Sequence, residues 1–216
     1  MAIKPTDFYN HLSSYGIEFF TGVPDSLLKE FCLCVDDRIS INNHIIAANE
    51  GNAIAIAAGY HLATGKLPLV YMQNSGLGNA VNPLLSLCDP DVYSIPMLLM
   101  IGWRGEPGVQ DEPQHVKQGK IQLELLETMD IPYEIISKGE ENIKNKIAKS
   151  VETSVKENRP YAIVVKKETF DTYKFSSLTI NEKLMFREES LEIILNNLPE
   201  NSIIVSTTGK TSREIF

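Results

Sequence analysis

The stretch HIIAANEGNAIAIAAGYHLATGK, residues 44–66, decides the fold of this chain. Its apolar start, residues 44–48, predicts a buried strand, and the small residues that follow predict a helix that ends near Thr64. Glu50 lies where the strand ends and the helix begins. Because open α/β sheets bind their ligands at the carboxyl ends of strands, Glu50 is a candidate site residue.

Two interpretations of Glu50 are open at this point. A helix of small residues packs closely against its neighbours, and an ionised carboxylate buried there is costly, which would indicate a functional site. A glutamate in the first turn of a helix is also favoured by the helix dipole and is common at a solvated surface. Position alone favours the surface interpretation, so the rest of the chain must distinguish the two.

The composition is that of a globular protein. The chain has 216 residues, 43% of them hydrophobic and 22% charged, which is enough for one full domain and part of another. A net charge of -8 argues against nucleic acid or an acidic membrane as a partner. No apolar run is long enough to span a bilayer or to serve as a signal peptide, and the 3 cysteines suit a reducing compartment, so we expect a cytoplasmic protein.

Strands alternate with helices along most of the chain. The predicted strands are residues 17–20, 44–48, 67–73, 95–101, 133–136 and 161–166, and predicted helices include residues 6–15, 27–35, 121–129 and 140–157. This alternation predicts an α/β fold: a doubly wound, mostly parallel six-stranded sheet with helices on both faces.

The end of the chain has a different pattern from the rest. We expect residues 1–166 to form the α/β domain and the polar residues 167–183 to form a linker. Residues 184–216 predict a helix, a strand at 203–205 and the start of another helix. A strand and helix start of this kind cannot bury themselves, so we expect the incomplete beginning of a second, similar domain.

Two glycine motifs of nucleotide-binding proteins are incomplete here. Gly76 and Gly78 begin a dinucleotide fingerprint, but its third glycine would fall at Val81. The GKT at residues 209–211 ends a P-loop motif, but Ile204 occupies the position of its first glycine. Gly76 therefore indicates either a flexible turn whose backbone closely approaches a ligand or a purely structural turn.

Four loops follow predicted strands and would line one edge of the sheet. They are residues 22–26, 49–52, 73–79 and 102–106. In the first, Asp25 or Ser26 is the expected N-cap of the next helix, where free backbone N–H groups can hold an anion. The last contains Arg104, a cationic candidate. His115 is a weaker candidate, within a polar and aperiodic segment, residues 105–118, that we expect to be a mobile lid.

At these loops the sequence resembles the N-terminal, pyrimidine-binding domain of the thiamine-diphosphate-dependent 2-oxo acid decarboxylases. The resemblance covers essentially the whole chain. It rests on TGVPDS (21–26), NEGNAIAIAAGYHLATGK (49–66), YMQNSGLGNAVNPLLSL (71–87), GWRGEPGVQDEPQH (102–115) and TTGKTSREIF (207–216). The fourth stretch points to the branch that acts on phosphonopyruvate, with the sulfopyruvate branch next.

The resemblance implies a role for Glu50. In the family, the matching glutamate hydrogen-bonds a ring nitrogen of the cofactor's aminopyrimidine and favours the imino tautomer, which then generates the thiamine diphosphate ylid. Asp25 is implied as a second catalytic residue that relays a proton to the intermediate. The implied cofactor contacts, besides Glu50, are Pro24, Asn74, Gly76 and Asn79.

The resemblance also implies a small anionic 2-oxo acid as substrate. The reaction would be the decarboxylation of phosphonopyruvate to phosphonoacetaldehyde, a lyase step in phosphonate biosynthesis, or the same chemistry with sulfopyruvate. The implied substrate contacts are Ser26, Arg104 and His115. The alternative from another class is a non-catalytic α/β module that binds a nucleotide or a partner through the same loops.

One family motif is absent from this sequence. The family holds the cofactor's diphosphate and Mg²⁺ at a GDG…N motif in a second domain, and no GDG occurs here. We therefore expect no metal ligands in this chain. The resemblance implies that thiamine diphosphate and Mg²⁺ are held with the second domain of a neighbouring subunit in a homo-oligomer, and that this chain alone is inactive.

Overall fold

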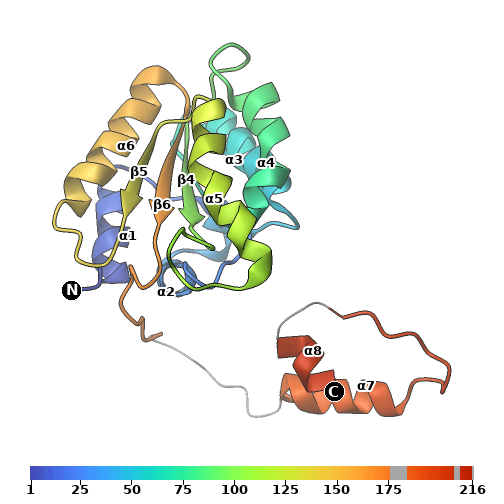
Figure 1. Cartoon of the computed structure of the whole chain (residues 1–216). Helices are drawn as coiled ribbons and strands as arrows, with labels where there is room; N and C mark the ends of the chain where they lie inside the picture. The colour runs from blue at the N-terminus through green and yellow to red at the C-terminus, as the bar shows by residue number, and fades with distance from the viewer. Residues whose placement is uncertain (176–183, 207–209, 216) are drawn as a thin grey trace. The chain divides into compact units, whose positions relative to one another are not determined.

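Six strands form one sheet in the computed structural model of this chain (Figure 1). The structure describes residues 1–175, 184–206 and 210–215. The strand order is β2-β1-β3-β4-β6-β5, and all neighbouring pairs are parallel. The predicted six-stranded α/β fold is confirmed, and the sheet is parallel throughout.

The elements alternate as the sequence predicts. The strands are β1 (Phe20–Gly22), β2 (His44–Ile46), β3 (Leu69–Gln73), β4 (Met97–Gly102), β5 (Tyr133–Ile136) and β6 (Pro160–Val165). The α-helices are α1 (Pro5–Ser14), α2 (Lys29–Arg38), α3 (Glu50–Thr64), α4 (Leu77–Pro83), α5 (Pro113–Thr128), α6 (Ile143–Glu157), α7 (Arg187–Asn196) and α8 (Lys210–Ile215). Shorter helical turns are η1 (Ile41–Asn43), η2 (Asn74–Gly76) and η3 (Leu84–Cys88). Within the described residues, no helix is both long enough and apolar enough to cross a membrane.

Helices cover both faces of the sheet (Figure 1). One core cluster joins the sheet to α1, α2 and α6, and the other joins it to α3, α4 and α5. In β4, Leu98 and Met100 belong to the first cluster, whereas Leu99 and Ile101 belong to the second. All six residues of β4 are buried, as expected for a parallel strand covered on both faces.

Small residues let α3 and β1 approach their neighbours closely. A Cβ atom at Gly22 would lie 2.0 Å from the backbone oxygen of Tyr71, its partner in β3. A Cβ atom at Gly51 would lie 2.8 Å from the backbone oxygen of Asn79. These glycines set the spacing between β1 and β3 and between the start of α3 and α4, where the candidate site residues lie.

The predicted lid, residues 105–118, is partly wrong, because α5 already begins at Pro113. Proline is favoured in the first turn of a helix, where its missing N–H is not needed. The first turns of α5 face solvent, so their residues are polar and show no apolar period. Gly76 ends the short helical turn η2, and α4 begins at the next residue, Leu77, so a turn is present at Gly76, and its approach to a ligand stays a prediction.

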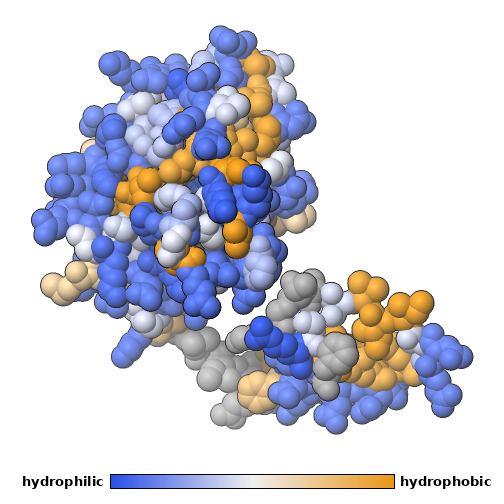
Figure 2. Space-filling view, in the orientation of Figure 1, coloured by the Kyte–Doolittle hydropathy of each residue, from blue (hydrophilic) through white to orange (hydrophobic). Residues whose placement is uncertain are grey.

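The chain divides into two compact units, Met1–Ser176 and Ser177–Phe216. In the second unit the predicted strand at 203–205 is wrong, because these residues form no strand in the part of the chain that the structure describes. Ile203 and Val205 are 92% and 91% exposed, and α7 has no buried residue. Figure 2 shows this unit's hydrophobic side chains at its surface. A strand needs a paired neighbour, and no strand of the described residues pairs with this segment.

The packing of Gly22 can be tested against a second glycine. We expect Gly22→Ala to destabilise the first unit by about 1–3 kcal/mol, because the new methyl group overlaps the Tyr71 backbone. Gly59→Ala, inside α3 with open space around it, should stabilise by about 0.5–1 kcal/mol. Urea unfolding followed by the fluorescence of Trp103, the single tryptophan, measures both. Equal stability of the two variants would contradict this packing.

Candidate active site

Glu50 is sheltered at the junction between β2 and α3. It is the first residue of α3, and the preceding Asn49 caps the helix by accepting a hydrogen bond from the backbone N–H of Asn52 at 2.9 Å. The Glu50 residue is only 9% exposed. The surface interpretation of Glu50 is therefore wrong, and the carboxyl group is held within the protein.

The Glu50 carboxyl group has one fixed oxygen and one available oxygen. Asn79 Nδ2 donates to Glu50 Oε2 at 2.8 Å. The other oxygen, Oε1, lies over Gly76, where a Cβ atom would be 2.1 Å away. Among the described residues, Oε1 has no hydrogen-bond partner. A glycine at position 76 is thus required by the carboxyl group, and Oε1 can meet a polar ligand atom such as a ring nitrogen.

Asp25 is a second buried carboxyl group, in the loop between β1 and α2. Its Oδ2 accepts a hydrogen bond from the Leu27 N–H at 3.1 Å and lies against Gly102, the last residue of β4. Its Oδ1 is buried and has no partner among the described residues. Burial raises the pKa of Asp25, while the Leu27 N–H and Arg104 oppose that rise. Asp25 can therefore retain a proton at higher pH than an ordinary aspartate.

The predicted helix cap at Asp25 or Ser26 is wrong. The residue before α2 is Leu28, and no side chain caps this helix. The Asp25 side chain instead closes the turn that precedes the helix, through its bond to the Leu27 N–H. Pro24 and Ser26, on either side of Asp25, are exposed. The loop therefore buries one acid and presents its neighbours to whatever binds at this edge.

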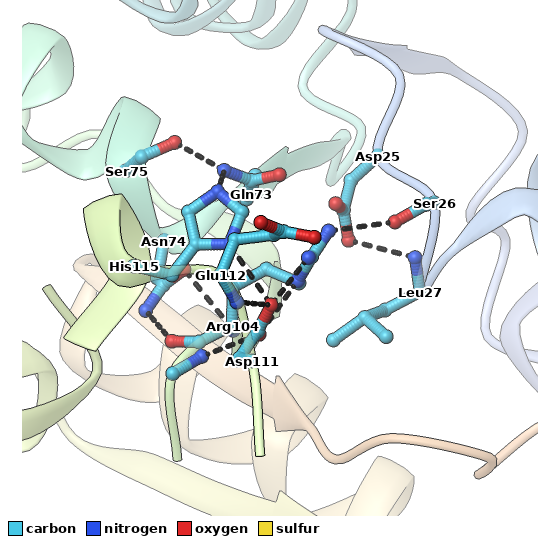
Figure 3. Close-up of polar contacts among 11 residues, drawn as sticks. Asp25, Ser26, Leu27, Gln73, Asn74, Ser75, Arg104, Asp111, Glu112 and His115 are labelled. Carbon is cyan, nitrogen blue, oxygen red and sulfur yellow. Dashed lines mark hydrogen bonds and ion pairs between the residues drawn. The ribbon is translucent and has the colours of Figure 1, made fainter. Parts of the chain in front are cut away.

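Arg104 forms an ion pair with Asp111 (Figure 3). Its Nε and Nη2 donate to the two carboxylate oxygens of Asp111 at 2.8 and 2.5 Å, and its Nη1 donates to Ser26 Oγ at 3.0 Å. The guanidinium group holds the pKa of Asp111 well below its usual range, and Asp111 raises the pKa of Arg104. Arg104 thus lies beside Ser26, but its charge is already neutralised by Asp111, and the predicted substrate contacts of both residues stay predictions.

His115 belongs to the same cluster. Its Nδ1 lies 3.1 Å from Asp111 Oδ1, and its Nε2 lies 3.4 Å from Nε2 of Gln73 (Figure 3). Because an ionised Asp111 can only accept, the Nδ1–H of His115 donates to it, and Nε2 is left to accept from the Gln73 amide. The Gln73 amide nitrogen also donates to Ser75 Oγ. This arrangement fixes one tautomer of His115 and directs it into the cluster.

Asn74 joins the ends of β3 and β4. Its Nδ2 donates to the Arg104 backbone oxygen at 2.7 Å, and its Oδ1 accepts from the Arg104 N–H at 3.1 Å. The residue is 2% exposed. These bonds favour a role in positioning Arg104, and the predicted contact of Asn74 with a cofactor stays a prediction.

The end of β3 connects two groups of candidate residues. One group consists of Glu50, Gly76 and Asn79, and the other contains Asp25, Ser26, Arg104 and His115. Gln73 and Asn74 contact the second group. Gly76, two residues after Asn74, lies against Glu50 of the first group. The four strand-end loops therefore meet at the carboxyl edge of the sheet, as the sequence predicts.

Sequence reasoning missed the central acid of the second group. Asp111 accepts from two side chains and from the backbone N–H groups of Gly105 and Glu112, both at 2.8 Å. The available signal was a carboxylate a few residues after Arg104. Glu106 and Glu112 offered the same signal, and spacing within a loop cannot distinguish them.

A cavity of about 340 Å³ also borders the loop that contains Asp25. It is lined by Pro24 and Asp25 together with residues of α2, β2 and β3, among them Cys32, His44 and Tyr71. Both ring nitrogens of His44 form hydrogen bonds. Nδ1 bonds Asp36 Oδ1 at 2.6 Å, and Nε2 bonds the Tyr71 hydroxyl at 2.7 Å. These two bonds hold His44 between α2 and β3 at this cavity. Among the described residues, no group of three or more His, Cys, Asp or Glu could hold a metal ion.

Comparison with known proteins gives matches over most of this chain. Residues 6–126 match the family described as thiamine pyrophosphate enzyme, N-terminal TPP binding domain. The chain is 31% identical over 230 residues to a phosphonopyruvate decarboxylase of Streptomyces hygroscopicus, which covers 99% of the chain and 56% of that protein. It therefore spans about half the length of this relative.

Two further comparisons concern a subunit and a solved structure. The chain is 37% identical over 125 residues to the sulfopyruvate decarboxylase subunit alpha of Methanococcus maripaludis, covering 58% of the chain and 72% of that subunit. The crystal structure of benzoylformate decarboxylase from Polynucleobacter necessarius has a TM-score of 0.58 at 15% identity, over 91% of this chain and 36% of that one. At this identity the structural likeness shows the fold alone.

The ion pair predicts a pH-dependent stability difference. Asp111 has a lowered pKa in the folded state, so it stabilises the fold above its unfolded pKa of about 4, and this contribution is lost as pH falls through the lower folded-state value. We expect Asp111→Asn to destabilise the protein by about 2 kcal/mol at pH 7 and by progressively less below about pH 4.

Urea unfolding at pH 7 and pH 3 measures the effect of Asp111→Asn. Glu112→Gln is the matched control, because Glu112 is the exposed neighbouring acid. If the free energy of unfolding differs between wild type and Asp111→Asn by the same amount at both pH values, the charge of Asp111 contributes nothing to stability.

Proposed function

We propose a function on the ground that this chain belongs to the family of thiamine pyrophosphate enzyme N-terminal domains. The chain supplies the pyrimidine-binding half of a 2-oxo acid decarboxylase that uses thiamine diphosphate, another name for thiamine pyrophosphate. The supporting observation is the buried carboxyl group of Glu50, with Oε2 fixed by Asn79 and Oε1 available above Gly76.

The residues around Glu50 fit an aminopyrimidine ring. Glu50 Oε1 would hydrogen-bond a ring nitrogen and exchange a proton with it, while Asn79 keeps the carboxyl group in one orientation. Gly76 leaves room beside the carboxyl group because it has no side chain. When bound, thiamine diphosphate supplies the electron sink for breaking the carbon–carbon bond. Its diphosphate and Mg²⁺ would be held by the second domain of a neighbouring subunit.

Asp25 is the second acid of the proposed reaction. Burial raises its pKa, so a larger fraction of Asp25 carries a proton at a given pH than in an ordinary aspartate. Its unpaired Oδ1 can give or take a proton without first breaking a bond within the protein. We assign Asp25 to proton transfer at the reacting carbon of the substrate and the Ser26 side of the loop to substrate binding.

The proposed substrate is phosphonopyruvate, and the products are phosphonoacetaldehyde and carbon dioxide. Support comes from the relative named for this activity, whose likeness extends along nearly the whole chain. Sulfopyruvate is the second candidate, because a subunit named for that activity has higher identity over a shorter segment. Both compounds are small 2-oxo acids with a second, strongly acidic group.

Glu50→Gln tests the assignment of the first acid. In the complete enzyme we expect kcat to fall by about 10²–10⁴-fold, because glutamine cannot exchange a proton with the ring nitrogen. Steady-state decarboxylation measures the loss, and Glu152→Gln, on the opposite face of the sheet in α6, is the control that should keep full activity. Full activity of Glu50→Gln would overturn the catalytic role of Glu50 and favour a non-catalytic α/β module as the role of this chain.

A substrate comparison tests the second assignment. We expect kcat/KM of the complete enzyme to be higher for phosphonopyruvate than for sulfopyruvate by about tenfold or more, a difference of about 1.4 kcal/mol in the transition state. A clear preference for sulfopyruvate would reverse the substrate assignment and leave the decarboxylase chemistry in place. Turnover of neither compound would contradict the proposed function.

A further inference from the structure

The proposed substrates need a positive charge that the protein does not already use. Phosphonopyruvate and sulfopyruvate each carry a carboxylate and a second oxyanion. Because these substrates come from the proposed function, the inference drawn below rests on that function. Arg104 is the cation that the sequence indicates, but two of its N–H groups go to Asp111 and a third goes to Ser26. Asp25 and Glu112 also lie close enough to raise its pKa. Arg104 is therefore engaged within the protein.

A small cavity lies where the loop after β1 meets the ends of β4 and β6. Its volume is about 180 Å³, and its lining includes Ser26, Trp103, Arg104, Glu106, Asp111 and Lys167. A second cavity is also lined by Arg104, Asp111 and Lys167. Lys167 follows β6 by two residues, so it extends from the same carboxyl edge of the sheet as the other candidate residues.

The charges around the smaller cavity are paired with one exception. Asp111 pairs with Arg104, and Glu106 pairs with Lys166 at 2.5 Å. The Lys166 ammonium group also lies 5.5 Å from the centre of the Trp103 ring. Lys167 has no ion-pair or hydrogen-bond partner among the residues that the structure describes. The cavity is thus left with one uncompensated positive charge.

Ser26 offers a hydrogen-bond donor to the same cavity. Its Oγ accepts from Arg104 Nη1 at 3.0 Å, so the hydroxyl proton is directed away from the guanidinium group. An oxyanion in the cavity can accept a hydrogen bond from this hydroxyl while facing the Lys167 ammonium group. Glu112 lines only the second cavity, so it does not place a competing charge in the smaller one.

We infer that Lys167 and Ser26 bind the tetrahedral oxyanion at C3 of the substrate, a phosphonate or a sulfonate, in this cavity. Arg104 is a positioning residue in this assignment: it orients the Ser26 hydroxyl and neutralises the charge of Asp111, which lines the same cavity. Both oxyanions present three oxygens to a donor and a cation, so the site recognises their shared chemistry.

Kinetics of the complete enzyme test this assignment. We expect Lys167→Gln to raise KM for the preferred substrate by about 10–100-fold and to change kcat by less than about threefold, because the lost contact is made in both ground and transition states. Lys167→Arg should restore most of the affinity. Lys120→Gln removes an exposed lysine of α5 that lines neither cavity, and it should leave KM unchanged. An unchanged KM in Lys167→Gln would overturn the assignment.

A binding measurement separates this assignment from the proposed reaction. Isothermal titration of the complete enzyme with 3-phosphonopropionate and 3-sulfopropionate, which lack the 2-oxo group, requires no turnover. Binding that is lost in Lys167→Gln supports the oxyanion site even if neither 2-oxo acid is decarboxylated. If a 2-oxo acid is decarboxylated but the analogues bind wild type and Lys167→Gln with equal affinity, the proposed function stands and the oxyanion site is rejected. The analogue that binds with the higher affinity shows whether the site prefers a phosphonate or a sulfonate.

Discussion

The contact between the Glu50 carboxyl group and Gly76 is the constraint on which the rest of the site depends. No side chain fits at position 76 while Glu50 Oε1 lies where it does, and Asn79 holds the other oxygen. The contact brings the start of α3 against the end of β3 and the start of α4. Gly51 serves the same approach, because any side chain there would meet the backbone of Asn79. A buried acid is thus fixed by packing, and its free oxygen is the feature that suits a heterocyclic ligand.

The end of β3 extends this constraint to the substrate side. Gln73 contacts His115, and Asn74, the first residue of η2, holds the backbone of Arg104, while Gly76 at the end of η2 lies against Glu50. A shift of this segment would therefore disturb both groups of residues together. The Arg104–Asp111 ion pair fixes the loop after β4, and for this reason we propose that the positive charge for a substrate comes from Lys167, which follows β6.

Much of the fold was predictable because strands covered on both faces must be apolar. The runs that became β3, β4 and β6 show this directly, because no end of these strands differs from its predicted position by more than two residues. The start of α5 was not predictable from periodicity, since its first turns face solvent. The burial of Glu50 could not be decided from its position in a first helical turn, because it depends on Gly76 and Asn79, which follow 26 and 29 residues later. Asp111 was hidden among equivalent acids whose side-chain directions only the folded loop determines.

The most direct test of this account is a crystal structure of the complete enzyme with thiamine diphosphate bound. We predict that a carboxyl oxygen of Glu50 lies within about 2.6–3.2 Å of a ring nitrogen of the aminopyrimidine, with Asn79 still bonded to the other oxygen. A cofactor whose ring is held by other residues, with Glu50 beyond hydrogen-bonding distance of it, would contradict the central claim.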